Sequence, residues 1–79
     1  MRLTQVTLGS TEIELADGTC ILFSGSFPVA ALVPGKGWIR TEQSPSPTAT
    51  KHANAWLMRH CGGTVQNVPQ WELDKLVAF

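Results

Sequence analysis

The chain has 79 residues, of which 43% are apolar and 15% charged, and six Lys and Arg balance six Asp and Glu. A chain of this length forms one small domain at most, because such a domain hides only about 60% of the surface that its unfolded form exposes. This excludes a deep catalytic cleft and separate cofactor and substrate domains. The balanced charge also excludes a global field that would steer the chain onto DNA or an anionic membrane.

No apolar run approaches the roughly 20 residues of a membrane span, and the first residues lack the apolar stretch of a signal peptide. We therefore expect a single domain over residues 1–79 and a cytoplasmic location. The two cysteines, Cys20 and Cys61, are too few for a disulfide scaffold. Both lie in apolar surroundings, so we expect reduced thiols that pack as small apolar side chains.

His52 and His60 share a predicted helix over about residues 47–61 with Cys61, which invites a metal-site interpretation. On a helix the two histidines stand about 12 Å apart along the axis, so they cannot share one zinc ion. A nucleophilic pair of Cys61 with a histidine lacks an orienting group and room for a substrate. We expect no metal, no cofactor and no enzymatic activity.

Five short stretches combine apolar and β-branched residues and are bounded by turn residues. They cover residues 3–8, 11–15, 20–23, 27–33 and 38–41. Turn signals about every ten residues predict an antiparallel meander of four or five strands over about residues 2–41. Pro28 restricts the start of its strand to an edge or a bulge, because proline donates no ladder hydrogen bond.

The register of the second hairpin is predicted from its turn. Asp17-Gly18 is a strong signal for a two-residue type I′ turn. Such a turn pairs Leu15 with Cys20 and Ile13 with Leu22. The four paired side chains would then share the core face of the sheet.

Residues 42–46 predict a loop, and residues 47–61 predict an amphipathic helix. Ser46 can cap its N-terminus, and Pro47 fits the first helical position. Residues 64–77 predict a short strand or extended stretch and then, from Pro69, a short helical segment. The predicted fold class is α+β, with the helix packed across the meander and the C-terminal segment closing one edge.

The candidate binding residues cluster at the start of this helix and are Thr48, Thr50, Lys51 and His52. A lysine in a first turn opposes the helix dipole, so helix stability does not explain Lys51. Backbone N–H groups, two hydroxyl groups and a cation around one point predict an anion or phosphate pocket. Lys36 and Arg40 would extend it into an anion-recognition surface centred on Lys51. The alternative is a solvated helix start in which the lysine has no role.

Trp38 follows a glycine-bounded turn and stands two residues before Arg40. One interpretation makes it a lid over the sheet face that carries Ile21 and Phe23. The other makes it the apolar neighbour of the anion-recognition surface, since tryptophan beside arginine is typical of interface centres.

Three runs of the sequence resemble a family of small uncharacterised proteins from bacteriophages and plasmids. The runs cover residues 27–31, 34–41 and 46–57. Family members read approximately PVAAxxPGKGxxRT and then SKHxNxWL, and the likeness spans about residues 20–60. The chain departs from the pattern at residues 47–50 and 61–63. The resemblance implies no activity, only a mobile-element context and a recurrent set of polar residues, which are Lys36, Arg40, Lys51, His52 and Asn54.

Two functions fit these observations. The first is a non-enzymatic accessory protein of a phage or mobile element that binds a protein partner. That partner would be a host factor or a host defence complex, as for an anti-CRISPR-type inhibitor, in the cytoplasm of a bacterial host. The second is a small nucleic-acid-binding module with a basic patch around Trp38. Its four cations, which make a thin electrostatic footprint, are Lys36, Arg40, Lys51 and Arg59.

Overall fold

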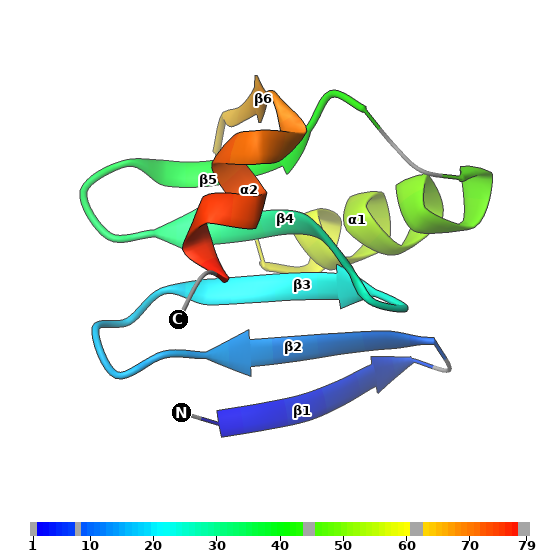
Figure 1. Ribbon diagram of the computed structural model, residues 1–79, viewed down its shortest axis with the longest axis horizontal. Coiled ribbons are helices and arrows are strands. Elements are labelled where there is room, and N and C mark those ends of the chain that lie inside the picture. The colour runs from blue at the N-terminus through cyan, green and yellow to red at the C-terminus, as the bar shows by residue number, and fades with distance from the viewer. Residues whose placement is uncertain (1, 8, 44–45, 61–62, 78–79) are drawn as a thin grey trace.

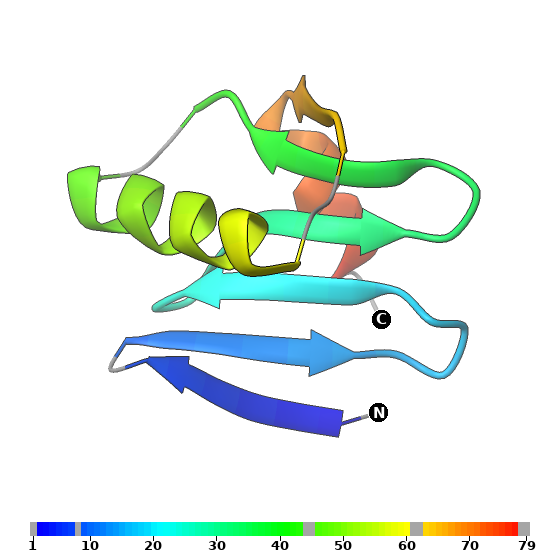
Figure 2. The ribbon, with the colours of Figure 1, turned by 180° about the vertical axis from the view of Figure 1, so that it is seen from behind.

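The computed structural model describes residues 2–7, 9–43, 46–60 and 63–77 (Figure 1). These residues form one six-stranded mixed sheet, in the order β1-β2-β3-β4-β5-β6, and two helices. The two helices cover opposite faces of the sheet, as the two opposed views show (Figures 1 and 2). The fold class is α+β, as predicted, but the sheet is mixed rather than purely antiparallel.

The meander forms as the spacing of turn residues predicts. Its strands are β1 (Arg2–Thr7), β2 (Ser10–Glu14), β3 (Cys20–Ser24), β4 (Phe27–Val33) and β5 (Gly37–Thr41). Each pairs antiparallel with the next. The sixth strand, β6 (Val65–Val68), pairs parallel to β5. Parallel pairing requires a crossover connection, and α1 (Pro47–His60) provides it.

Local signals at the two helices and at Pro28 are confirmed. The Ala49 N–H donates to Ser46 Oγ at 3.1 Å, which is the predicted N-cap of α1. The second helix, α2 (Gln70–Leu76), follows Pro69 directly. Pro28 lies where the β3–β4 register shifts, which is the bulge that a proline in a central strand requires. Cys61, the predicted last residue of the first helix, lies outside the described residues.

The predicted register of the β2–β3 hairpin is wrong by one residue. Glu14, not Leu15, pairs with Cys20, and Ile13 pairs with Ile21. A one-residue slip moves every side chain of a strand to the other face. Leu22 and Cys20 therefore face α1 and its core cluster, whereas Ile21 faces α2.

The conformation of Asp17 explains the error. A type I′ turn requires positive φ at both central residues, but only Gly18 adopts it, because no described residue other than glycine has a positive φ. Instead, Asp17 Oδ1 accepts the Thr19 N–H at 3.0 Å. The Leu15 N–H also donates to the Thr19 carbonyl at 2.8 Å. This side-chain turn lengthens the loop to residues 15–19 and resets the pairing.

The core consists of two layers, one on each face of the central strands. The layer beneath α1 contains Leu22, Val29, Ala30, Ala49, Ala53, Trp56 and Leu57. The layer beneath α2 contains Ile21, Ala31, Ile39, Val68 and Leu73. Both faces of the middle of β3 and β4 are covered, and residues 20–23 and 27–33 are accordingly apolar throughout.

The outer pair of strands, β1 and β2, is much less covered. The main helix contacts with the sheet are those of α1 with β3 and β4 and of α2 with β4 and β5. Leu3 on β1 is 68% exposed. Figure 1 shows β1 at the open edge of the sheet. We call β1 and β2 the outer pair and β3, β4 and β5 the central strands.

Candidate functional site

The seven predicted site residues do not gather on one surface. Lys36 Nζ pairs with Glu72 Oε2 at 2.9 Å, so it is bound to α2 on the face opposite α1. His52 Nδ1 lies 2.7 Å from Ser24 Oγ and ties α1 to the end of β3. Each of these side chains thus has a structural partner within the fold.

The start of α1 does not approach Lys36. Lys51 and Thr48 are exposed, and Ala49 and Ala53 are buried against the sheet. At 100° per residue, Lys51 points away from the sheet, on the solvent side of the helix. The Thr50 hydroxyl donates to the Ser46 carbonyl at 3.3 Å. A surface centred on Lys51 that includes Lys36 is therefore not assembled in this fold.

Trp38 is neither a lid over Ile21 and Phe23 nor an exposed hot spot. It lies on the face beneath α1, packed against the Trp56 cluster. The two indole rings meet edge to face with centroids 5.5 Å apart. Trp56 Nε1 in turn donates to Glu12 Oε1 at 2.7 Å. Trp38 therefore acts as core packing for the helix.

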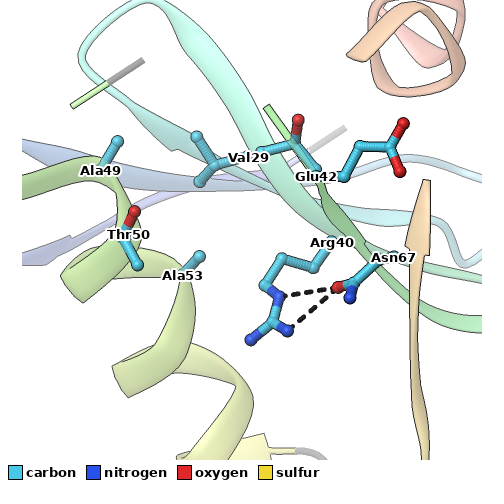
Figure 3. Close-up of a pocket in the computed structure, with 8 residues that line it drawn as sticks. Val29, Arg40, Glu42, Ala49, Thr50, Ala53 and Asn67 are labelled. Atoms are coloured by element: carbon cyan, nitrogen blue, oxygen red, sulfur yellow. Dashed lines mark hydrogen bonds between the residues drawn. The ribbon is translucent and has the colours of Figure 1, made fainter. Parts of the chain in front are cut away.

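Arg40 is the predicted residue that the fold places in a cleft. It lies on β5 directly opposite Asn67 on β6. Arg40 Nε and Nη2 donate to Asn67 Oδ1 at 3.1 and 3.0 Å, and Nη1 donates to Asn54 Oδ1 at 2.8 Å. Figure 3 shows the guanidinium group directed from the strand toward α1. Two amides from different elements thus fix the planar group in one orientation.

The charge of Arg40 is positioned but not neutralised. Both of its partners are neutral amide oxygens, and the ion pairs among the described residues are Arg2–Glu14 and Lys36–Glu72. Glu42 lines the same cleft, but its carboxylate points away from the guanidinium group (Figure 3). A guanidinium group has five N–H donors, and three of those of Arg40 bind oxygen atoms of described residues.

Two hollows flank the guanidinium group, and Arg40 lines both. The first has a volume of about 260 Å³ and an apolar floor formed by Val29, Ala49 and Ala53. The second has a volume of about 420 Å³ and is lined by Leu57, Met58 and Val65 together with Asn54. Met58 is 86% exposed. We call Arg40, its two asparagines and the two hollows the Arg40 cleft.

The contact between Ser24 and His52 is the one arrangement among the described residues that resembles a nucleophile and its base. The hollow beside His52, which Ser10 and Trp56 also line, has a volume of only about 30 Å³. That is the room of about one water molecule, far below that of a substrate pocket. The contact fastens α1 to the end of β3.

The described residues contain no group of three His, Cys, Asp or Glu side chains placed to hold a metal ion. Neither described helix is both long and apolar enough to cross a membrane.

The sequence predicted Arg40 as a site residue but did not predict the two asparagines that bind its side chain. Asn54 belongs to the recurrent pattern of polar residues, which marked it without assigning a role. Asn67 carried no signal, because its contact depends on the parallel pairing of β5 with β6. Local patterns do not show such a pairing, since the crossover through α1 brings the two strands together.

The chain belongs to a family of unknown function (DUF8033), whose match covers residues 1–75. No curated protein and no solved structure matches the chain.

Proposed function

We propose that the chain is a non-enzymatic protein-binding module that uses the Arg40 cleft to hold an acidic side chain of a protein partner. The observation that carries this proposal is the fixed guanidinium group of Arg40, which has no carboxylate partner among the described residues. A guanidinium fork matches the two oxygens of a carboxylate, and its orientation by Asn54 and Asn67 lowers the entropic cost of binding.

The apolar walls of the cleft define the partner further. Leu57, Met58 and Val65 line the larger hollow directly beside the guanidinium group. An acidic residue next to a leucine, methionine or phenylalanine would place its carboxylate on Arg40 and its apolar neighbour in this hollow. An exposed, flexible methionine adapts its shape to such side chains.

The distribution of cations favours a protein over a nucleic acid as the binding partner. Lys36 is paired with Glu72, Lys51 faces solvent on the outer side of α1, and Arg59 lines the small hollow on the other flank of that helix. These charges do not form the continuous stripe that tracks a phosphate backbone. One oriented cation beside apolar side chains instead resembles the centre of a protein interface.

The context of the partner comes from the resemblance to phage and plasmid proteins. In that context, we propose that the partner is a bacterial host factor or a complex of the host defence machinery. Its contact surface would carry an exposed acidic residue beside an apolar one. Binding without chemistry is sufficient for such an inhibitor or adaptor.

A direct test is a titration of the ¹⁵N-labelled chain with a capped Glu-Leu dipeptide, followed by NMR. One ion pair and one apolar side chain give millimolar affinity at best, so the titration extends to about 10 mM. We expect shifts of the Arg40 Nε–H and of the side-chain amides of Asn54 and Asn67. Arg40→Gln should abolish them, whereas Lys51→Gln, which removes the same charge nearby, should leave them unchanged.

Two outcomes contradict the proposal. Shifts centred on residues 48–52 would place the binding site at the start of α1 instead. An Arg40 Nε–H signal that does not shift would exclude the Arg40 cleft as the binding site. A labelled DNA duplex tests the nucleic-acid alternative. An affinity that falls steeply with salt, and that Arg40→Gln, Lys51→Gln and Arg59→Gln each reduce, would favour that alternative.

A further inference from the structure

The open edge of β1 has an unusual composition for an unprotected strand. Within the described residues β1 pairs with β2 alone. Its sequence, RLTQVT, contains no proline and no lysine, two of the residues with which sheets commonly block an edge. The β1–β2 register shifts between Gln5 and Thr7, so the regular part of this edge is the stretch of residues 2–5. The opposite edge is different, because β6 is only four residues long and Pro69 follows it. The two edges of the sheet are therefore not equivalent.

The outer pair also exposes apolar side chains on the face that carries α2. Leu3 pairs with Ile13, which pairs with Ile21, so the three share that face. Ile21 is fully buried, Ile13 half-buried and Leu3 68% exposed. Burial thus falls step by step toward the edge, because the main contacts of α2 with the sheet are those with β4 and β5.

We propose that β1 pairs with β1 of a second copy of this chain, antiparallel and around a two-fold axis near Thr4. The unpaired backbone groups of an edge strand are satisfied by another extended strand. Arg2, the only charged residue of β1, stands at its first position. Antiparallel pairing sets the two Arg2 side chains at opposite ends of the ribbon, whereas parallel pairing would bring these like charges together.

The net charge of the chain and the symmetry of the proposed strand pair are both compatible with a second copy as the partner. The net charge is zero at pH 7, so two copies do not repel each other. A two-fold axis perpendicular to the sheet keeps the α2 faces of both copies on the same side. The two Leu3 side chains then lie diagonally across the new strand pair and cover each other. The Arg40 cleft lies at the far edge of the sheet, so this inference is independent of the proposed function.

The strand pair is short, so the dimer is weak. A contact limited to one six-residue strand per copy belongs to the class of small interfaces, below about 1,200 Å² in total. We therefore expect a dissociation constant in the range of about 10 µM to 1 mM. At nanomolar concentrations the chain is a monomer.

Sedimentation velocity across this concentration range tests the proposal. The apparent mass of the wild-type chain should rise toward that of a dimer, and Leu3→Lys should remain monomeric because it sets two like charges side by side. Met58→Lys adds the same charge at another exposed apolar residue, on α1, and should dimerise like the wild type. Circular dichroism of all three proteins checks that each is folded.

Two results would overturn the proposal. The first is a wild-type chain that stays monomeric up to about 1 mM, the upper limit of the expected range, in which case the edge accepts a strand of another protein or none. The second is a dimer that Leu3→Lys leaves intact. Hydrogen exchange adds an independent measurement, since pairing should protect amides of β1 as the protein concentration rises, while the amides of β6 stay unchanged.

Discussion

The central strands and the outer pair belong to one sheet but are stabilised differently. Helices cover both faces of the central strands, where Leu22 and Ile21, neighbours in sequence, are each fully buried on opposite faces. In the outer pair, Ile13 is only half-buried and Leu3 is largely exposed. The comparison shows that the position of the helices decides how deeply each strand is buried, and we therefore expect the central strands to contribute more to stability than the outer pair.

The largest expected effect is a difference in the free energy of unfolding between alanine variants of two leucines, one from each region. Leu22→Ala removes a fully buried side chain and should lower the free energy of unfolding by about 2–5 kcal/mol. Leu3→Ala removes the same atoms from an exposed position and should cost less than about 0.5 kcal/mol. Urea denaturation at a concentration where the chain is monomeric measures both variants.

The same contrast shows that the burial of Leu22 does not depend on the register predicted for the β2–β3 hairpin. The register predicted for the β2–β3 hairpin is wrong, yet Leu22 is buried because both faces of β3 are covered. Equal costs for Leu22→Ala and Leu3→Ala would contradict the division of the sheet into two regions. Ile21→Ala, on the other face of β3, should be as costly as Leu22→Ala.

A second prediction concerns the bond that joins the outer pair to α1. Trp56 Nε1 donates to Glu12 Oε1 at 2.7 Å, and Trp56 is 2% exposed. Trp56→Phe removes the donor and part of the ring, and should cost about 1–3 kcal/mol. Glu12→Gln keeps an acceptor oxygen without the charge and should cost about 1 kcal/mol.

A double-mutant cycle decides whether the two effects share one interaction. Combining Trp56→Phe with Glu12→Gln should cost less than the sum of the single variants, because Trp56→Phe removes the bond that Glu12→Gln only weakens. Additive costs would show that the bond does not couple β2 to the helix. Thermal unfolding followed by circular dichroism gives the four free energies.

The sequence predicted features that short-range contacts determine. The cap at Ser46 depends on residues three apart, and the bulge at Pro28 depends on a missing donor, so both could be predicted without the fold. The hairpin prediction was wrong because it relied on Asp17-Gly18 alone, whereas the Asp17 side chain accepts the Thr19 N–H and sets a longer loop.

The candidate site was predicted only in part, because local sequence patterns do not show which distant residues come into contact. Arg40, Lys51 and Asn54 were marked as polar residues of a recurrent pattern, but the pattern does not show which of them meet. The parallel pairing of β5 with β6 brings Asn67 to Arg40 from 27 residues away. Arg40 could be selected from the sequence. The residues that orient it became evident only from the crossover through α1.

The third prediction compares one ion pair from each region. Lys36–Glu72 fastens the β4–β5 hairpin to α2, and its side chains are 42% and 23% exposed. Arg2–Glu14 joins the outer strands, with side chains that are 73% and 41% exposed. Screening by water leaves each pair worth only about 0–1 kcal/mol, and the less exposed pair should lie nearer the upper limit.

Lys36→Ala should therefore destabilise the chain more than Arg2→Ala does. Repeating both unfolding measurements at about 1 M salt, where the screening length is about 3 Å, should reduce the cost of Arg2→Ala almost to zero. A larger cost for Arg2→Ala would show that the outer pair depends on charge more than its exposure suggests.

The smallest effect concerns Cys20, which lies at the boundary between the two regions, directly opposite Glu14. Burial raises the pKa of its thiol above the ordinary value of 9.0, and the negative charges of Glu12 and Glu14 raise it further. The folded chain thus holds the thiol proton more tightly than the unfolded chain. This contribution to stability is present below the unfolded pKa and is lost as the pH rises through the folded pKa.

The rate of alkylation of this thiol by iodoacetamide, measured against pH in a Cys61→Ser background, reports that pKa because the thiolate is the reactive species. We expect the folded chain to react more slowly near pH 9 than the chain in urea. Glu14→Gln should shift the rate profile to lower pH, since it removes one of the charges that oppose the thiolate. Glu72→Gln, on the opposite face of the sheet, should leave the profile unchanged. A profile identical in folded and unfolded chains would mean that α1 and the outer pair leave Cys20 fully open to solvent.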